Sequence, residues 1–116
     1  WGTGRAIRDF IYIEDACEAI FLSMQNYNES ELVNISSGEA VSIRELVELI
    51  ADLTSFQGEI NWDSSKPEGQ LEKVFSVERM KKYLDYQTSH TLREGITKTI
   101  KWLDNNYSLA RLSVSK

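Results

Sequence analysis

The sequence predicts an α/β fold with short strands and about four helices, contained in one domain of 116 residues. Apolar residues recur at helical spacing in several segments, and short β-branched and aromatic runs lie between them. Two Ser/Thr-x-x-Glu capping boxes mark helix starts. The strands are too few and too short for a free-standing sheet, so we expect a small lobe that packs against something else.

The first elements expected are a strand and a helix. The aromatic and β-branched run at 10–13 predicts a buried strand, and Asp15 stands at the N-cap position of the helix that follows. That helix, at 16–27, has a broad apolar face. Cys17 falls on this face, where we expect it to be buried as a small hydrophobe.

A strand at 32–35 and a tight turn at 36–39 come next, with Gly38 as the left-handed residue of the turn. Ser42 and Glu45 then form the clearest local signal in the chain, a capping box that opens a helix. The apolar face of that helix consists of Ile43, Leu46, Val47, Ile50 and Leu53.

The middle of the chain alternates short extended pieces with loop. Alternation at 59–62 predicts a strand, and 63–70 is a loop that holds the only proline. A short extended piece at 73–75 precedes a helix at 76–84, which Ser76 would cap and which would turn Val77, Met80 and Leu84 inward.

The last helix begins at a second capping box, formed by Thr91 and Glu94. Its apolar stripe consists of Leu92, Ile96, Ile100 and Leu103. Residues 108–116 are polar with scattered aliphatic residues, so we expect a disordered tail.

Composition excludes several classes of protein. A net charge of −5 argues against non-specific binding to nucleic acid or to an anionic membrane, because both need a basic surface. The single cysteine allows no internal disulfide, which favours a reduced compartment and a cytoplasmic location. No apolar stretch approaches the length of a membrane span.

The sequence contains no recognisable reaction centre. Its only histidine, His90, lies in a turn before the last helix, where a lone histidine is most often solvated. One Cys and one His cannot build a zinc site, and capping and solvation explain the pair Glu14–Asp15. Neither a dinucleotide-binding fingerprint nor a Tyr-x-x-x-Lys motif is present. We therefore expect no catalytic residue, metal or bound cofactor in this chain alone.

Four residues are suited to an anionic, hydroxyl-rich ligand. Trp1 could stack on a ring or a sugar face, and Arg8 offers a fork of donors for phosphate. Lys66 supplies a cation and Glu68 a carboxylate that can accept from hydroxyl groups. Structural roles are the alternative: an apolar end residue, a surface charge and a solvated loop pair. The position of Arg8 directly before a buried-type strand favours a functional role.

Several motifs within residues 1–107 match one known family. They are WGTGRAIRDFIYIED (1–15), VNISSGE (33–39), SIREL (42–46), DSSKPEG (63–69), SVER (76–79) and LREGI (92–96) with Trp102. Together they resemble the C-terminal part of an extended short-chain dehydrogenase/reductase, of the NAD-dependent epimerase/dehydratase family, that acts on nucleotide sugars. The Ser-Lys-Pro-acid-Gly loop resembles the GDP-L-fucose synthase branch of that family.

The resemblance implies that 1–107 is the small substrate-binding lobe of an enzyme with an NAD(P)-binding Rossmann fold. Arg8 would serve the diphosphate of a GDP-sugar, Trp1 the pocket wall and Glu68 a hydroxyl, while Lys66 belongs to the same pocket loop. NADP and the catalytic Ser, Tyr and Lys would belong to a Rossmann lobe that precedes this chain. The strand and helix at 9–27 would pack on that lobe.

The implied reaction is the NADPH-dependent conversion of GDP-4-keto-6-deoxymannose to GDP-L-fucose. Another epimerase or dehydratase, acting on UDP- or dTDP-sugars, is the first alternative. A non-catalytic interaction module is the second, with its docking face on Ala16, Ile20, Phe21 and Met24. A homo-oligomer is a further expectation, because without the Rossmann lobe apolar surface would be exposed.

Overall fold

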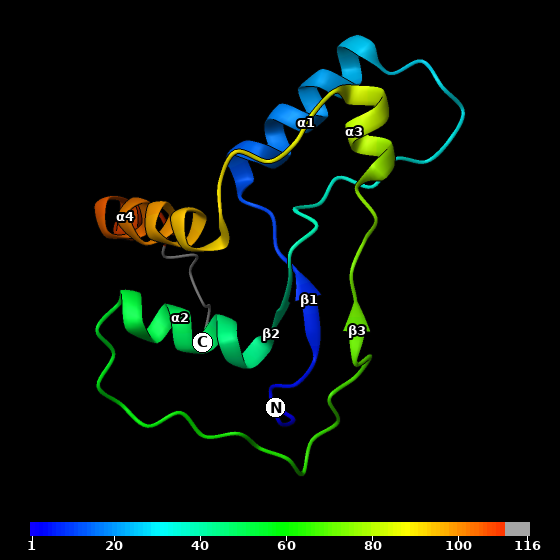
Figure 1. Cartoon of the computed structure of the whole chain (residues 1–116). Coiled ribbons are helices and arrows are strands. Elements are labelled where there is room, and N and C mark those ends of the chain that lie inside the picture. Colours follow the sequence, from blue (N-terminus) through cyan, green and yellow to red (C-terminus); the bar gives the residue numbers. More distant parts are fainter. Residues whose placement is uncertain (111–116) are drawn as a thin grey trace.

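A three-stranded sheet stands at the centre of the lobe, with β1 (Ile7–Asp9) between β2 (Ala40–Ser42) and β3 (Glu72–Lys73) (Figure 1). The computed structural model describes residues 1–110, with side chains as far as Tyr107. β1 runs antiparallel to β2 and parallel to β3. The expected α/β fold with short strands and four helices is confirmed.

Helices α1 (Ile13–Asn26) and α3 (Glu78–Leu84) pack against each other beyond one end of the sheet. Their contact encloses the core, whose buried members are Ala19, Met80, Leu84 and Tyr86. Partly buried apolar side chains surround it: Leu22, Tyr27, Val33, Ile35 and Val77. The predicted inward positions of Met80 and Leu84 are confirmed.

The opposite face of α1 is apolar and exposed. Ile13, Phe21 and Met24 are 65%, 58% and 80% exposed, and Ile20 shares their face. Cys17 also lies on this face and is exposed, so the prediction that it is buried is wrong. Each residue turns a helix by about 100°, which places Cys17 opposite the side that contacts α3.

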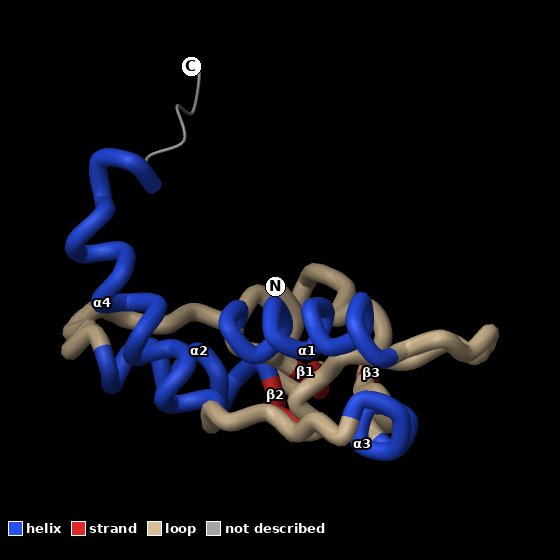
Figure 2. The backbone as a smooth tube through the Cα atoms, turned by 90° about the horizontal axis from the view of Figure 1, so that it is seen from above, coloured by secondary structure: helices blue, strands red, loops and turns tan. Residues whose placement is uncertain are grey.

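Helices α2 (Ile43–Leu53) and α4 (Leu92–Ala110) lie together on the other side of the molecule, and α4 extends away from the rest at its far end (Figure 2). Both predicted capping boxes are confirmed. The hydroxyl of Ser42 accepts from the main-chain N–H three residues ahead at 3.1 Å, and the hydroxyl of Thr91 does so at 3.3 Å. In each box the N3 glutamate accepts in return from the N-cap residue.

Three of the predicted strands form no ladder in the described part of the chain. β1 ends at Asp9, so 10–13 is not a strand, and 32–35 and 59–62 are unpaired as well. An apolar run predicts burial but not a pairing partner. In place of a ladder, the turn at 36–38 is held by the Asp9 carboxylate, which accepts from main-chain and hydroxyl groups.

Several boundaries also differ. α1 begins at Ile13, so Asp15 lies within the first turn and is not the N-cap. The N-cap of α3 is Val77, one residue after the predicted Ser76. The left-handed conformation of Gly38 is confirmed by its φ of +76°.

The end of the chain departs from the predicted tail in one respect. α4 continues to Ala110, so the first three residues of the predicted tail at 108–116 are helical. The remainder, 111–116, lies outside the described residues. Within 1–110, no helix combines the length and apolarity needed to cross a membrane.

Two loops bear on function. The opening loop, residues 1–5, leads into β1, and the proline loop, residues 63–70, leads toward β3. Both lie at the end of the sheet that is far from α1 and α3 (Figure 1).

Candidate functional site

The opening loop is fastened to the proline loop by hydrogen bonds at both ends of the latter. The main-chain N–H of Gly2 donates to the carbonyl of Asp63 at 2.8 Å. The N–H of Thr3 donates to Glu68 Oε1 at 2.8 Å, and the Thr3 hydroxyl donates to the same oxygen. Residues 65 positions apart in the sequence thus meet at one carboxylate.

Glycine is required at two positions of the opening loop. Gly2 and Gly4 have φ values of +69° and +77°, which side chains rarely tolerate. A Cβ on Gly2 would lie 2.5 Å from Glu68 Cγ, and one on Gly4 would lie 2.6 Å from the ring of Trp62. The two glycines therefore let the loop approach its neighbours closely.

Trp1 and Lys66 face each other across these two loops. The Lys66 ammonium nitrogen lies 6.0 Å from the centroid of the Trp1 ring, at the outer limit of a cation–π contact. Trp1 is 83% exposed, an unusual position for a side chain that can bury so much apolar area. An aromatic face beside a cation suits a ligand that has both a ring and a negative charge.

Arg8 and Lys73 are register partners on β1 and β3, so their side chains leave the same face of the sheet. Like charges at such positions destabilise a sheet unless an anion lies near them. The Arg8 guanidinium donates to the carbonyl of Ile7 at 2.6 Å and to that of Gln70, the last residue of the proline loop, at 2.7 Å.

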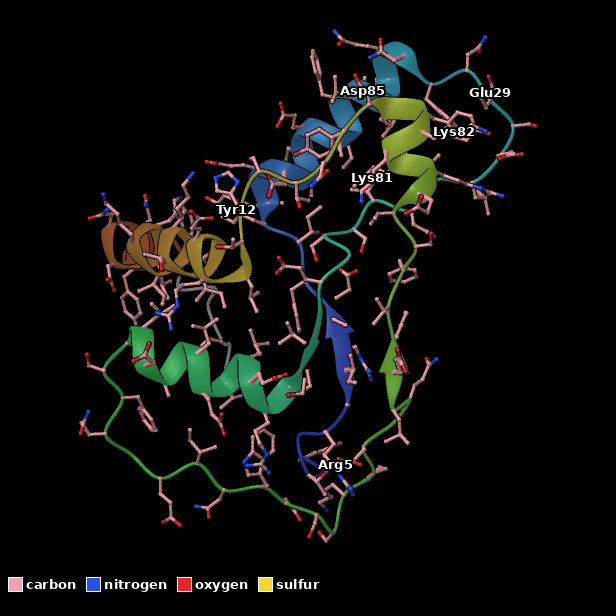
Figure 3. The ribbon with its side chains drawn as sticks, viewed as in Figure 1. Arg5, Tyr12, Glu29, Lys81, Lys82 and Asp85 are labelled. Carbon is pink, nitrogen blue, oxygen red and sulfur yellow. The ribbon has the colours of Figure 1, made fainter. Side chains whose placement is uncertain are left out.

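Two further arginines flank the opening loop. Arg5 donates to the Thr3 hydroxyl at 3.0 Å, and Figure 3 shows it below β1 where the two loops meet. Arg44 donates to the Thr3 carbonyl at 2.7 Å and lies over the Trp62 ring at 4.6 Å. None of these cations, nor Arg8, Lys66 or Lys73, forms an ion pair with a carboxylate of the described residues. Five cations thus lie in or beside the two loops, together with the carboxylates of Asp63, Glu68 and Glu72.

All four residues expected from the sequence lie in or beside these two loops. Hydrogen bonds from the Thr3 hydroxyl and N–H lower the pKa of Glu68, outweighing burial, so its carboxylate is ionised near neutral pH. Sequence patterns missed Thr3 and Arg44. The position of Thr3 between two glycines was the only local signal, and Arg44 reaches the loop only because β2 pairs with β1.

A second polar cluster surrounds Asp15, which is 1% exposed. Its carboxylate accepts from the hydroxyl of Ser89 at 2.8 Å, the N–H of His90 at 3.2 Å and the hydroxyl of Tyr86 at 3.3 Å. His90 Nδ1 lies 2.9 Å from Asp15, which assigns the proton to Nδ1 and leaves Nε2 to accept from Lys98 at 2.7 Å. The prediction of a solvated His90 is therefore wrong, since its side chain is only 18% exposed.

The Asp15 cluster is structural. Burial alone would raise the pKa of Asp15, but the hydrogen bonds from His90 and Ser89 bring it to about 2. Burial and the adjacent negative charges raise the pKa of Tyr86, so its hydroxyl remains a donor. In the described part of the chain, no buried side-chain nitrogen or oxygen lacks a hydrogen-bond partner. The cluster fastens the segment before α4 to α1.

An apolar cleft of about 310 Å³ lies between α2, α4 and the segment that precedes α1. Its lining includes Phe10, Tyr12, Leu46, His90 and Ile96. No Lys or Arg lines it, so it is unsuited to a phosphate group.

A dinucleotide such as NADP does not fit the described residues. Pyrophosphate binding needs a glycine-rich turn that opens a helix, where the backbone can approach the phosphates. Gly2 and Gly4 lead into strand β1, and Glu68 and Trp62 already fill the space beside them.

Comparison with known proteins assigns the chain to a family. Residues 1–103 match the family model described as GDP-mannose 4,6 dehydratase. The chain belongs to this family. The GDP-L-fucose synthase 1 of Arabidopsis thaliana is 35% identical over 106 residues, which make up 91% of this chain and 32% of that protein. A relative from Methanocaldococcus jannaschii that carries the name of a UDP-glucose 4-epimerase is 30% identical, over 91% of this chain and 34% of that protein.

A solved structure extends the family assignment to the fold. A GDP-L-fucose synthetase from Naegleria fowleri bound to NADP superimposes with a TM-score of 0.87 at 28% identity, covering 95% of this chain and 35% of that one. The fold is therefore that of the C-terminal part of extended short-chain dehydrogenases/reductases. The chain spans about a third of the length of the curated relatives it matches.

Proposed function

We propose that this chain is the nucleotide-sugar-binding lobe of a longer epimerase/reductase that converts GDP-4-keto-6-deoxymannose to GDP-L-fucose with NADPH. The observation that carries the proposal is the convergence of Trp1, Arg8, Lys66 and Glu68 on the two loops, among cations that form no ion pair within the described residues. An anion with a ring and hydroxyl groups satisfies all four side chains.

Each residue has a distinct role in this proposal. Arg8 spends two N–H donors on main-chain carbonyls, and its other donors serve the diphosphate. Trp1 forms the pocket wall, and Lys66 adds a positive charge beside it. Glu68 is held at Oε1 by Thr3, so it accepts a ligand hydroxyl through Oε2.

The remaining part of the enzyme would supply NADP and the catalytic groups. The exposed apolar face of α1, with the apolar cleft next to its start, is the surface on which we place that nucleotide-binding lobe. Burying this face would remove the large exposed apolar side chains Ile13, Phe21 and Met24 from water. The threefold greater length of the relatives supports this arrangement.

A UDP- or dTDP-sugar epimerase or dehydratase is the second candidate. The relative from Methanocaldococcus jannaschii favours it, because that protein carries the name of a UDP-glucose 4-epimerase. The nucleotides GDP, UDP and dTDP distinguish the candidates when each is added to the chain in a thermal unfolding series, since the ligand that binds the native state raises the midpoint.

The decisive experiment titrates GDP into the isotope-labelled chain and follows main-chain amides by NMR. Arg8→Ala should weaken binding by on the order of 2 kcal/mol, about 30-fold, because it removes charged hydrogen bonds to phosphate. Arg93→Ala is the matched control, since Arg93 pairs with Asp52 at 3.0 Å on the side of α2 and α4. Equal losses of GDP affinity in Arg8→Ala and Arg93→Ala would overturn the role of Arg8. Amide signals that do not shift at millimolar GDP would overturn the proposed function.

NADPH provides the complementary test. The chain alone should show no heat of binding in a calorimetric titration with NADPH, because the described residues offer no pyrophosphate loop. Micromolar affinity would contradict the assignment of the cofactor to the other lobe.

A further inference from the structure

Thr3 contacts no ligand group in the recognition proposed above, yet it stands at the junction of the two loops and holds Glu68. Its hydroxyl accepts from Arg5 Nε at 3.0 Å and donates to Glu68 Oε1, while its main-chain N–H donates to the same oxygen at 2.8 Å. A threonine hydroxyl has one proton and two lone pairs, so the Thr3 hydroxyl can act as a donor to Glu68 and as an acceptor from Arg5 at the same time. We call the contact of Thr3 with Glu68 the clasp.

The clasp closes the proline loop at its far end. The bond from Gly2 to the Asp63 carbonyl holds the start of that loop, and the clasp holds it five residues later. Lys66 lies between these two fixed points, and Trp1 lies two residues before Thr3. The separation of 6.0 Å between Lys66 and the Trp1 ring therefore depends on both attachments.

The clasp is favourable because its acceptor is charged. Hydrogen bonds to an ionised carboxylate are shorter and stronger than those between neutral groups. Most of the proline loop is exposed, and apart from the clasp its ends are held by the hydrogen bonds Gly2–Asp63 and Arg8–Gln70, so we expect the segment around Lys66 to lose order without the clasp. Ordering a loop before binding improves affinity, since the ligand no longer bears the entropy loss.

We propose that Thr3 is a positioning residue that acts through Glu68 to hold Lys66 and Trp1 against the same nucleotide diphosphate. This inference rests on the proposed function for its ligand. The clasp itself rests only on the geometry of the two loops.

The test compares Thr3→Val with Thr3→Ser in the full chain, with GDP as the probe. Valine keeps the shape and the main-chain N–H but removes the hydroxyl, whereas serine restores it. Thr3→Val should weaken GDP binding about tenfold, the equivalent of one lost charge-assisted bond, and Thr3→Ser should stay within about twofold of the original chain. Thr97→Val, on the exposed side of α4, is the control for an unrelated threonine. Unchanged affinity in Thr3→Val would overturn the proposal.

A second measurement separates failure of the clasp from failure of the proposed function. The amide proton shift of Thr3 should follow the titration of Glu68 as pH falls, and Glu68→Gln should abolish that response. If the Thr3 amide proton shift in the original chain does not change with pH, the clasp is wrong, regardless of which ligand binds. If the Thr3 amide shift follows the titration of Glu68 but the chain does not bind GDP, the clasp stands and the proposed nucleotide ligand is wrong.

Discussion

Two carboxylates, Asp15 and Glu68, each bind residues far away in the sequence, yet their surroundings are opposite. Asp15 is 1% exposed, and its partners Ser89 and His90 belong to the segment before α4. Glu68 is only half-buried, and it lies in the same pair of loops as Trp1, which is 83% exposed. Asp15 fastens the segment before α4 to α1, whereas Glu68 fastens the exposed proline loop to the opening loop.

The difference separates stability from recognition. Around Asp15, no buried side-chain nitrogen or oxygen of the described residues lacks a hydrogen-bond partner, which indicates a structural role. Around Glu68 several cations form no ion pair with a carboxylate in the described part of the chain, and the large aromatic side chain of Trp1 is exposed to water. Changes at Asp15 should therefore act on unfolding, and changes near Glu68 on binding.

The largest expected effect is that of Asp15→Asn on stability. The amide nitrogen of asparagine donates, so it would oppose the donors that now point at the carboxylate, and we expect a loss of about 2–4 kcal/mol. Urea denaturation followed by circular dichroism measures it. Glu14→Gln is the control, because Glu14 is 62% exposed and should change stability by less than about 0.5 kcal/mol. If folded Asp15→Asn lost GDP binding, the separation would be wrong.

The next effect is the acid sensitivity of the same cluster. The pKa of Asp15 is about 2 in the fold against 3.8 for the free group, so its contribution is complete above pH 4 and is lost as pH falls toward 2. The difference amounts to about 2 kcal/mol. Denaturation at a series of pH values should show the gap between the original chain and Asp15→Asn narrowing over that interval. A constant gap would contradict the assignment.

Gly2→Ala tests the surface loop. The added Cβ would lie 2.5 Å from Glu68 Cγ, so the clasp should be displaced and GDP affinity should fall about tenfold. Gly69→Ala is the matched control: its φ of +72° carries the same backbone strain, but a Cβ there would meet nothing within 4 Å. Equal losses in the two variants, measured by the NMR titration, would show that strain alone is responsible.

The smallest effect is that of a helix cap that bonds neither of these two carboxylates. Ser42→Ala removes the acceptor for the first turn of α2 and should lower stability by about 1 kcal/mol. Thr97→Ala in the exposed middle of α4 should be nearly neutral. Both are read from urea midpoints. A loss of GDP affinity in Ser42→Ala would mean that loss of the cap disturbs the opening loop through the pairing of β2 with β1.

The helices were largely predictable, and the sheet was not. The boxes at Ser42 and Thr91 fixed two helix starts because a cap joins residues only three positions apart. The strands predicted at 32–35 and 59–62 rest on local patterns of apolar residues, but a ladder also needs a partner, and within the described residues none forms there. The prediction that Cys17 is buried fails because the apolar face of α1 is the exposed one. The buried side of α1 carries Asp15 and Ala19 instead.

The sequence by itself determined the starts of α2 and α4, the loop character of 63–70 and the membership of Trp1, Arg8, Lys66 and Glu68 in one motif set. Only the tertiary structure decided that Thr3 meets Glu68 across 65 positions, and that Asp15 meets His90 across 75. Local propensities act over a few residues. Contacts between such distant groups require closure of the intervening chain, which lowers its conformational entropy. Burial of the whole core provides the free energy that compensates for this loss.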